Sequence, residues 1–157
     1  MPIPLKDFPR WLQGIAKQMR DNAAEIQTRA AIDIGREMLE RSPVVSGNFQ
    51  AGFNIAETRS AALRYRRTMA DSKGNVRGIN FIQTLTKHKA SFQRLKKSLL
   101  NGGDTWIGNA VPYGIYVPSI RAVPWTRLAS ETFSKSVRRS LNNGELLKNV
   151  GRPRGRG

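Results

Sequence analysis

Few residues in this chain have the side chains and the spacing that enzyme chemistry needs. His88 is the only histidine, it lies between two lysines, and the chain has no cysteine. A zinc site takes three or four nitrogen, sulfur or oxygen ligands, so His88 has no companions of the usual kind. We therefore interpret His88 as a solvated surface residue.

The acidic residues beyond position 41 are scattered. Hydrolases and magnesium-dependent nucleases bring two or more carboxylates together. No such spacing occurs among the five acidic residues of this part, which are Glu57, Asp71, Asp104, Glu131 and Glu145. The G-x-x-x-x-G-K-[ST] phosphate loop is also missing. The sequence thus predicts a protein that is not an enzyme and that uses no metal or cofactor.

Positive charge is the stronger chemical signal. The 157 residues carry a formal net charge of +16. Residues 1–41 are nearly neutral, whereas residues 58–103 carry eleven basic residues and one acidic residue, and residues 105–157 carry nine and two. A body of this charge should face nucleic acid, an acidic protein surface, or both. The alternative is a solvated face that only confers solubility.

The candidate contacts to DNA or another anionic partner are basic side chains that follow residue 58. They are Arg64, Arg66, Arg67, Arg77, Lys96 and Lys97. Such side chains can follow a phosphate backbone. Tyr65 is the only aromatic residue between Arg64 and Arg77, so base stacking has little support. We expect any contact with nucleic acid to be nonspecific.

We predict that one domain, residues 1–150, positions these side chains. A basic tail at 151–157 follows it and is expected to be disordered unless bound. Apolar residues at spacings of three and four predict an amphipathic helix of about 30 residues between Asp7 and Arg41. The stripe consists of Trp11, Ile15, Met19, Ala23, Ile26, Ala30, Ile34 and Met38. Pro43 ends the helix, since the residue before a proline avoids helical geometry.

The remaining pattern predicts a small antiparallel sheet and two further helices, an α+β fold. Residues 47–57 alternate as a half-buried strand with Phe49, Ala51, Phe53 and Ile55 on one face. A basic excursion without regular period is expected at 58–79, a helix at 80–100 and a second strand near 105–109. The last helix should run from about Pro124 to Leu141. The side chains predicted to point inward from it are Trp125, Leu128, Phe133 and Val137.

Short strands with free edges favour pairing with a neighbouring subunit. The predicted subunit-interface residues are the apolar and aromatic residues of these segments: Phe49, Phe53, Ile55, Trp106, Tyr113 and Tyr116. The residues Pro43, Ser46 and Gly47 are predicted to form a structural turn between the first helix and the first strand. Gly47 suits a tight or left-handed backbone there.

The order of three short segments resembles a known family. The long helix ends in Arg41-Ser42-Pro43-Val44-Val45-Ser46-Gly47-Asn48-Phe49. The segment from Ile107-Gly108-Asn109 to Pro112-Tyr113-Gly114-Ile115-Tyr116 follows later, and Ala122-Val123-Pro124-Trp125 leads into the last helix. In this order, over residues 9 to 140, the chain is similar to the neck and tail-completion (head–tail joining) proteins of tailed bacteriophages, the HK97 gp10-like family.

The resemblance implies a structural virion protein with the α+β fold described above. It would form a homo-oligomeric ring of six or twelve copies at the head–tail junction, between the portal or adaptor and the tail proteins, with DNA passing through the lumen. It would be assembled in the host cytoplasm, located in the neck or tail of the virion, and bound to no membrane. The alternative is a nonspecific DNA-binding basic protein.

Overall fold

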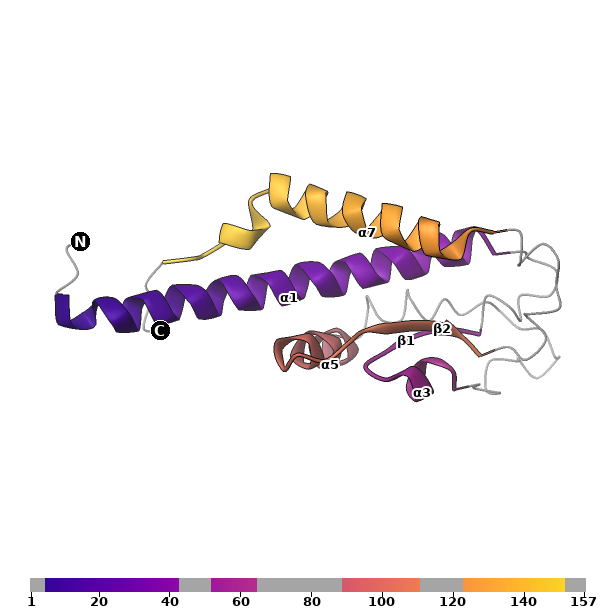
Figure 1. Cartoon of the computed structure of the whole chain (residues 1–157), viewed down its shortest axis with the longest axis horizontal. Coiled ribbons are helices and arrows are strands. Elements are labelled where there is room, and N and C mark those ends of the chain that lie inside the picture. Colours follow the sequence, from indigo (N-terminus) through magenta and orange to yellow (C-terminus); the bar gives the residue numbers. More distant parts are fainter. Residues whose placement is uncertain (1–4, 43–51, 65–88, 111–122, 152–157) are drawn as a thin grey trace.

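The computed structural model describes residues 5–42, 52–64, 89–110 and 123–151. Its elements in chain order are η1 (Leu5–Asp7), α1 (Phe8–Glu40), β1 (Phe53–Ala56), α3 (Arg59–Ala62), α5 (Lys89–Leu100), β2 (Trp106–Asn109), α7 (Trp125–Asn142) and η4 (Glu145–Leu147). Figure 1 shows α1 running the length of the molecule, with α7 along one side and the strands, α3 and α5 on the other. The α+β fold is therefore as predicted.

The long first helix is confirmed. It spans 33 residues, and the proline in its first turn is Pro9, which loses no helical hydrogen bond there. Asp7 stands at the N-cap position but makes no side-chain capping hydrogen bond. At the other end the Ser42 hydroxyl donates to the Met38 carbonyl oxygen over 2.6 Å, which satisfies one of the last helical acceptors.

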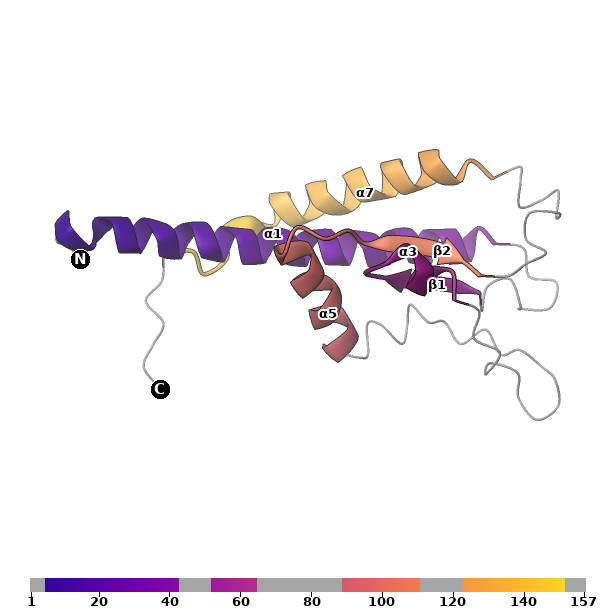
Figure 2. The same cartoon turned by 60° about the horizontal axis from the view of Figure 1, so that its bottom comes forward.

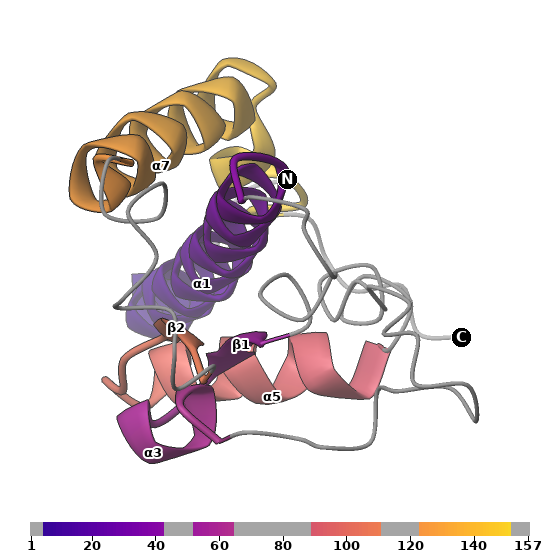
Figure 3. The same cartoon turned by 90° about the vertical axis from the view of Figure 1, so that its right-hand side faces the viewer.

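The two strands pair antiparallel, with Phe53 opposite Asn109 and Ile55 opposite Ile107. Here the expectation of a half-buried strand is wrong, because all four residues of β1 are buried. The short helix α3, which falls at the start of the basic excursion predicted at 58–79, lies beside the strands (Figure 3). The Asn54 amide nitrogen reaches the carbonyl oxygen of Ala62, the last residue of α3. The face of β1 that carries Asn54 is therefore closed by α3.

The main core joins α1, β1 and α5. Ile32, Ile55 and Leu95 are each less than 5% exposed and contact one another. Leu39, Phe92 and Ile107 pack around this cluster. Because the three central residues come from three elements, this cluster fixes the sheet and α5 against the middle of α1.

Helix α5 ends as predicted. Gly102 has a left-handed φ of +77°. The Gly103 N–H donates to the Ser98 carbonyl oxygen over 2.9 Å, and the Gly102 N–H donates to the Leu99 carbonyl oxygen over 3.1 Å. This pair of bonds is the Schellman arrangement that closes a helix C-terminus. Residues 80–88, the expected first half of this helix, lie outside the described part.

Helix α7 packs against α1 through small and polar side chains. Ser136 and Ser140 are its buried residues, and the Ser136 hydroxyl donates to an Asp33 carboxylate oxygen over 2.6 Å. Trp125, Leu128 and Val137 are partly buried, as expected for inward residues. Phe133 is 40% exposed, so its inward placement is wrong. The fully buried positions of α7 are thus two serines, while its inward bulky residues are buried only in part.

Candidate subunit-contact and anion-binding surfaces

The first three turns of α1, residues 8–17, extend beyond the other elements and are here called the N-terminal arm (Figures 1 and 2). The arm exposes 46% of Phe8, 38% of Trp11 and 45% of Leu12. The Phe8 and Trp11 rings stack on each other with centroids 5.7 Å apart. Since residues three and four apart share a helix face, these side chains form one apolar stripe that water covers in the single chain.

The same face of α1 is covered further along the helix. The Asn22 side-chain amide donates to the carbonyl oxygens of Leu146 and Lys148 over 2.9 and 3.0 Å. The Gly151 N–H donates to the Gln18 side-chain oxygen over 2.9 Å. In these three hydrogen bonds between α1 and residues 146–151, Gln18 is the α1 residue nearest the N-terminus. The stripe on the arm is thus the uncovered continuation of an internal packing face.

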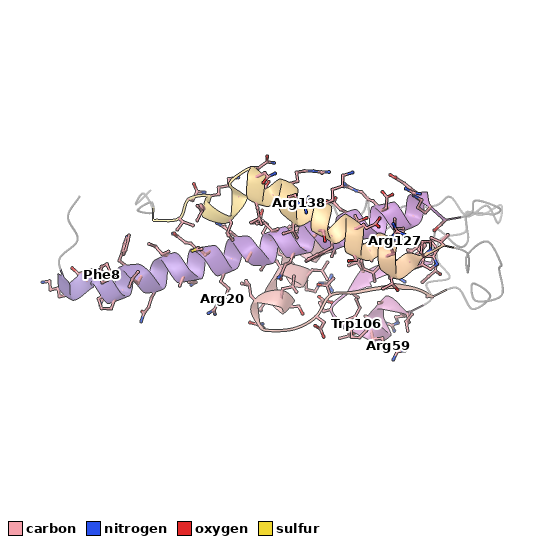
Figure 4. All side chains as sticks on the ribbon, turned by 45° about the horizontal axis from the view of Figure 1, so that its top comes forward. Phe8, Arg20, Arg59, Trp106, Arg127 and Arg138 are labelled. Atoms are coloured by element: carbon pink, nitrogen blue, oxygen red, sulfur yellow. The ribbon has the colours of Figure 1, made fainter. Side chains whose placement is uncertain are left out.

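A second apolar surface lies at the strands and is here called the sheet patch, Leu63 and Trp106. These side chains are 47% and 41% exposed. A methyl group added at Gly108 would lie 3.0 Å from Leu63 Cδ2, which places Leu63 directly over that glycine. Trp106 and Gly108 are two residues apart on β2 and share a sheet face. Figure 4 shows Trp106 well separated from Phe8 along the molecule.

Two of the predicted interface residues are not available to a second subunit. Phe53 and Ile55 are 5% and 4% exposed and lie in the chain's own core. The Phe53 ring packs on Trp125 of α7 with ring centroids 6.1 Å apart. Their assignment as interface residues is therefore wrong, because α1, α5 and α7 already cover the strand. Trp106 is exposed as an interface residue should be.

Several other predicted residues lie outside the described part of the chain. They are the interface residues Phe49, Tyr113 and Tyr116, the turn residues Pro43, Ser46 and Gly47, and the basic residues Arg66, Arg67 and Arg77. For these positions the predictions stand as made.

The predicted anion contacts that are described do not behave alike. Arg64 and Lys97 are exposed. The Lys96 side chain is only 16% exposed, and its ammonium nitrogen lies 3.1 Å from Glu25 Oε2. Lys96 is therefore committed to an ion pair that ties α5 to α1, and its assignment as a contact to DNA or a partner protein is wrong.

Glu25 is the centre of an ion-pair network between three elements. Besides Lys96 it binds Arg29, whose guanidinium also lies 2.9 Å from Glu145 Oε2 of η4. Burial alone would raise the pKa of Glu25, but the hydrogen bond and charge of Lys96, together with Arg29, lower it below its usual value. The carboxylate is therefore held in its charged form. Glu25 joins α1 to α5, and Arg29 extends the network to η4.

A third surface, on α7, was not singled out from the sequence. Lys135, Arg138 and Arg139 are exposed on this helix, which lies outermost on its side of α1 (Figure 3). Together with Ser130, Glu131, Ser134, Asn142 and Asn143 they line a hollow of about 600 Å³. The signal available in the sequence was helical spacing, since Lys135, Arg138 and Asn142 follow one another by three and four residues.

A cluster of metal-ligating side chains is not found among the described residues. Within ranges 5–42, 52–64, 89–110 and 123–151, no three His, Cys, Asp or Glu side chains lie close enough to hold a metal ion. None of the helices described there has the length and apolar character to span a bilayer. Comparison with known proteins gave no match to a family model, a curated protein or a solved structure.

Proposed function

We propose that this chain is a structural virion protein of a tailed bacteriophage. It forms a ring at the head–tail junction, joins the portal or adaptor to the tail, and helps to retain or pass the genome. Three short segments in the family's order support the proposal. The fold supports it too, since a long helix packed on a small antiparallel sheet is the architecture that the resemblance implies.

The observation that carries the proposal is the pair of uncovered apolar surfaces, the N-terminal arm and the sheet patch. They differ in residues and lie apart on the molecule. When two different surfaces of identical subunits bind each other, the contact is heterologous, and repeated contacts close into a ring if the rotation permits. A chain with this pair of surfaces is suited to cyclic assembly.

The arm can contribute useful binding free energy. Complete burial of one large apolar side chain stabilises by ~1.5–3 kcal/mol. Phe8, Trp11 and Leu12 are each 38–46% exposed, so covering what remains yields about 2–4 kcal/mol in total. Residues 1–41 as a whole carry seven basic and six acidic residues, so α1 adds little net charge to a chain that is otherwise strongly cationic. The arm itself holds Arg10 and Lys17 and no acidic residue, so its contact must keep these two charges in solvent.

Native mass spectrometry of the full chain tests the proposal. We expect one closed oligomer of six or twelve copies for the wild type. Trp11→Glu places a charge in the stripe and should shift the population to smaller species, with unchanged helix content by circular dichroism. Gln13→Glu is the matched control, because Gln13 is exposed and lies two residues away around the helix. A wild type that never exceeds a monomer, or a Trp11→Glu chain that assembles like the control, contradicts the proposal.

A further inference from the structure

The exposed face of α7 holds positive charge that the described part of the protein does not neutralise. Glu131 is bound by Arg127, with Nε and Oε1 2.7 Å apart, and Glu145 is bound by Arg29. These are the two acidic residues of 123–151. Lys135, Arg138 and Arg139 have no acidic partner among the described residues. Lys135 and Arg138 therefore remain without a counter-charge on one short stretch of helix. Arg139 lines the neighbouring pocket that also holds Asp33 and Glu145, but it forms no ion pair with either.

Helix stability does not account for this cluster. Cations favour a helix C-terminus, but the effect falls off within the last turn. Arg139 is the basic residue in the last turn of α7, while Lys135 and Arg138 precede that turn. Arg138 is two residues away from each of the buried serines, Ser136 and Ser140. Two residues correspond to a rotation of about 200° around the helix axis. The Arg138 side chain is thus directed away from α1 and adds nothing to the packing of α7.

The uncharged neighbours of these cations have the chemistry of phosphate contacts. Ser130, Ser134, Asn142 and Asn143 line the same hollow. Serine and asparagine side chains are regular donors to DNA phosphates beside lysine and arginine. From Ser130 to Asn142 the helix rises by about 18 Å. Duplex DNA presents one negative charge per ~1.7 Å of its axis, so phosphate charges are available along the whole of this stretch of helix.

We propose that this face of α7, centred on Lys135, Arg138 and Arg139, binds the phosphate backbone of double-stranded DNA without reading its sequence. The described residues that line the hollow include no aromatic side chain. The contact is therefore electrostatic, and its strength depends on salt concentration. The binding surface differs from the two apolar surfaces that the ring requires, so either proposal can fail while the other stands.

Fluorescence anisotropy tests this surface. A labelled 30-base-pair duplex of random sequence is titrated with full-length protein at several salt concentrations. The test variant is the triple substitution Lys135→Gln, Arg138→Gln and Arg139→Gln. Each lost phosphate contact removes ~0.9 from the slope of log K against log salt. We expect the slope to fall by about 2 to 3 units and the affinity in 0.1 M salt to fall by up to ~500-fold.

The control removes the same charge elsewhere, by Arg20→Gln, Arg59→Gln and Lys148→Gln, at exposed positions outside the N-terminal arm, the sheet patch and α7. If α7 is the binding face, the control keeps a wild-type slope. Equal losses in both triple variants, with circular dichroism unchanged, mean that binding follows net charge alone and overturn the proposal. A wild type that binds an acidic protein surface but not the duplex overturns it as well.

Discussion

Asn54 joins β1 to α3 and provides a sharp test of the fold. It is 6% exposed. Its side-chain nitrogen lies 3.3 Å from the carbonyl oxygens of Gly52, Ala62 and Arg64. Three acceptors around one atom identify that atom as the amide nitrogen and not the oxygen. The substitution Asn54→Ala removes both of the hydrogens that these carbonyls share.

The expected loss follows from those contacts. A buried polar group left without its partner costs about 1–3 kcal/mol. Small domains have a free energy of unfolding of only ~5–15 kcal/mol, so this loss is a large fraction of the total. We expect the unfolding free energy of Asn54→Ala to fall by about 1–3 kcal/mol.

Asn54→Asp gives the same site a pH dependence of known sign. Burial and the surrounding carbonyl oxygens raise the pKa of the aspartate in the folded state above the ~3.9 of an unfolded chain. The folded state then holds a proton that the unfolded state has lost. Relative to the wild type, stability therefore falls as pH rises through the folded-state pKa, and the penalty is smallest below the unfolded-state pKa. At neutral pH the penalty should exceed that of Asn54→Ala.

Urea unfolding followed by circular dichroism between pH 3 and 8 measures both variants. Asn142→Ala, at an exposed position of α7, is the control and should stay within about 0.5 kcal/mol of the wild type. An Asn54→Ala chain as stable as this control, or an Asn54→Asp penalty that does not change with pH, refutes the assignment of Asn54 as the donor that holds α3 on the strand.

Two further predictions concern the core and the ion-pair network. Leu95 is 2% exposed, so Leu95→Ala should lower the unfolding free energy by about 2–5 kcal/mol. Leu95→Met keeps the volume of the side chain and should lower it by less than ~1.5 kcal/mol. Equal losses in the two variants would contradict the assignment of Leu95 to the core. Glu25→Gln should cost about 0.5–1 kcal/mol at neutral pH, because the Glu25 side chain is 35% exposed and its ion pairs are partly screened. Since the pairs lower the pKa of Glu25, their contribution is present above the unfolded-state pKa of ~4.3 and is lost as pH falls through the folded-state value. A difference between Glu25→Gln and the wild type that persists unchanged into acid would refute this.

Elements with strong local signals were predictable from the sequence. The apolar stripe from Trp11 to Met38 predicted α1, and the end predicted for the second helix at residue 100 is the end of α5. The burial of Asn54 was not predictable, because it depends on α3 folding back over the strand. The exposure of Phe133 was not predictable either, since the buried line of α7 runs through Ser136 and Ser140. Residue size alone does not reveal which side of a helix meets its neighbour.

The surfaces were harder to predict than the elements. A stripe of apolar residues looks the same in the sequence whether the folded chain buries it, as at Ile26, or leaves it exposed, as at Trp11. Lys96 looks like any other lysine of the basic segment until Glu25 is brought to it from 71 residues away. Both outcomes depend on tertiary contacts, which composition and periodicity do not contain.

The central claim is that the chain is a component of a phage neck, and its copy number in purified particles tests this most directly. Quantitative mass spectrometry of tailed particles assembled from the genome that encodes the chain would measure that number against the portal protein. The account predicts six or twelve copies in every particle. Particles that are complete, tailed and infectious yet contain none of the chain would contradict it.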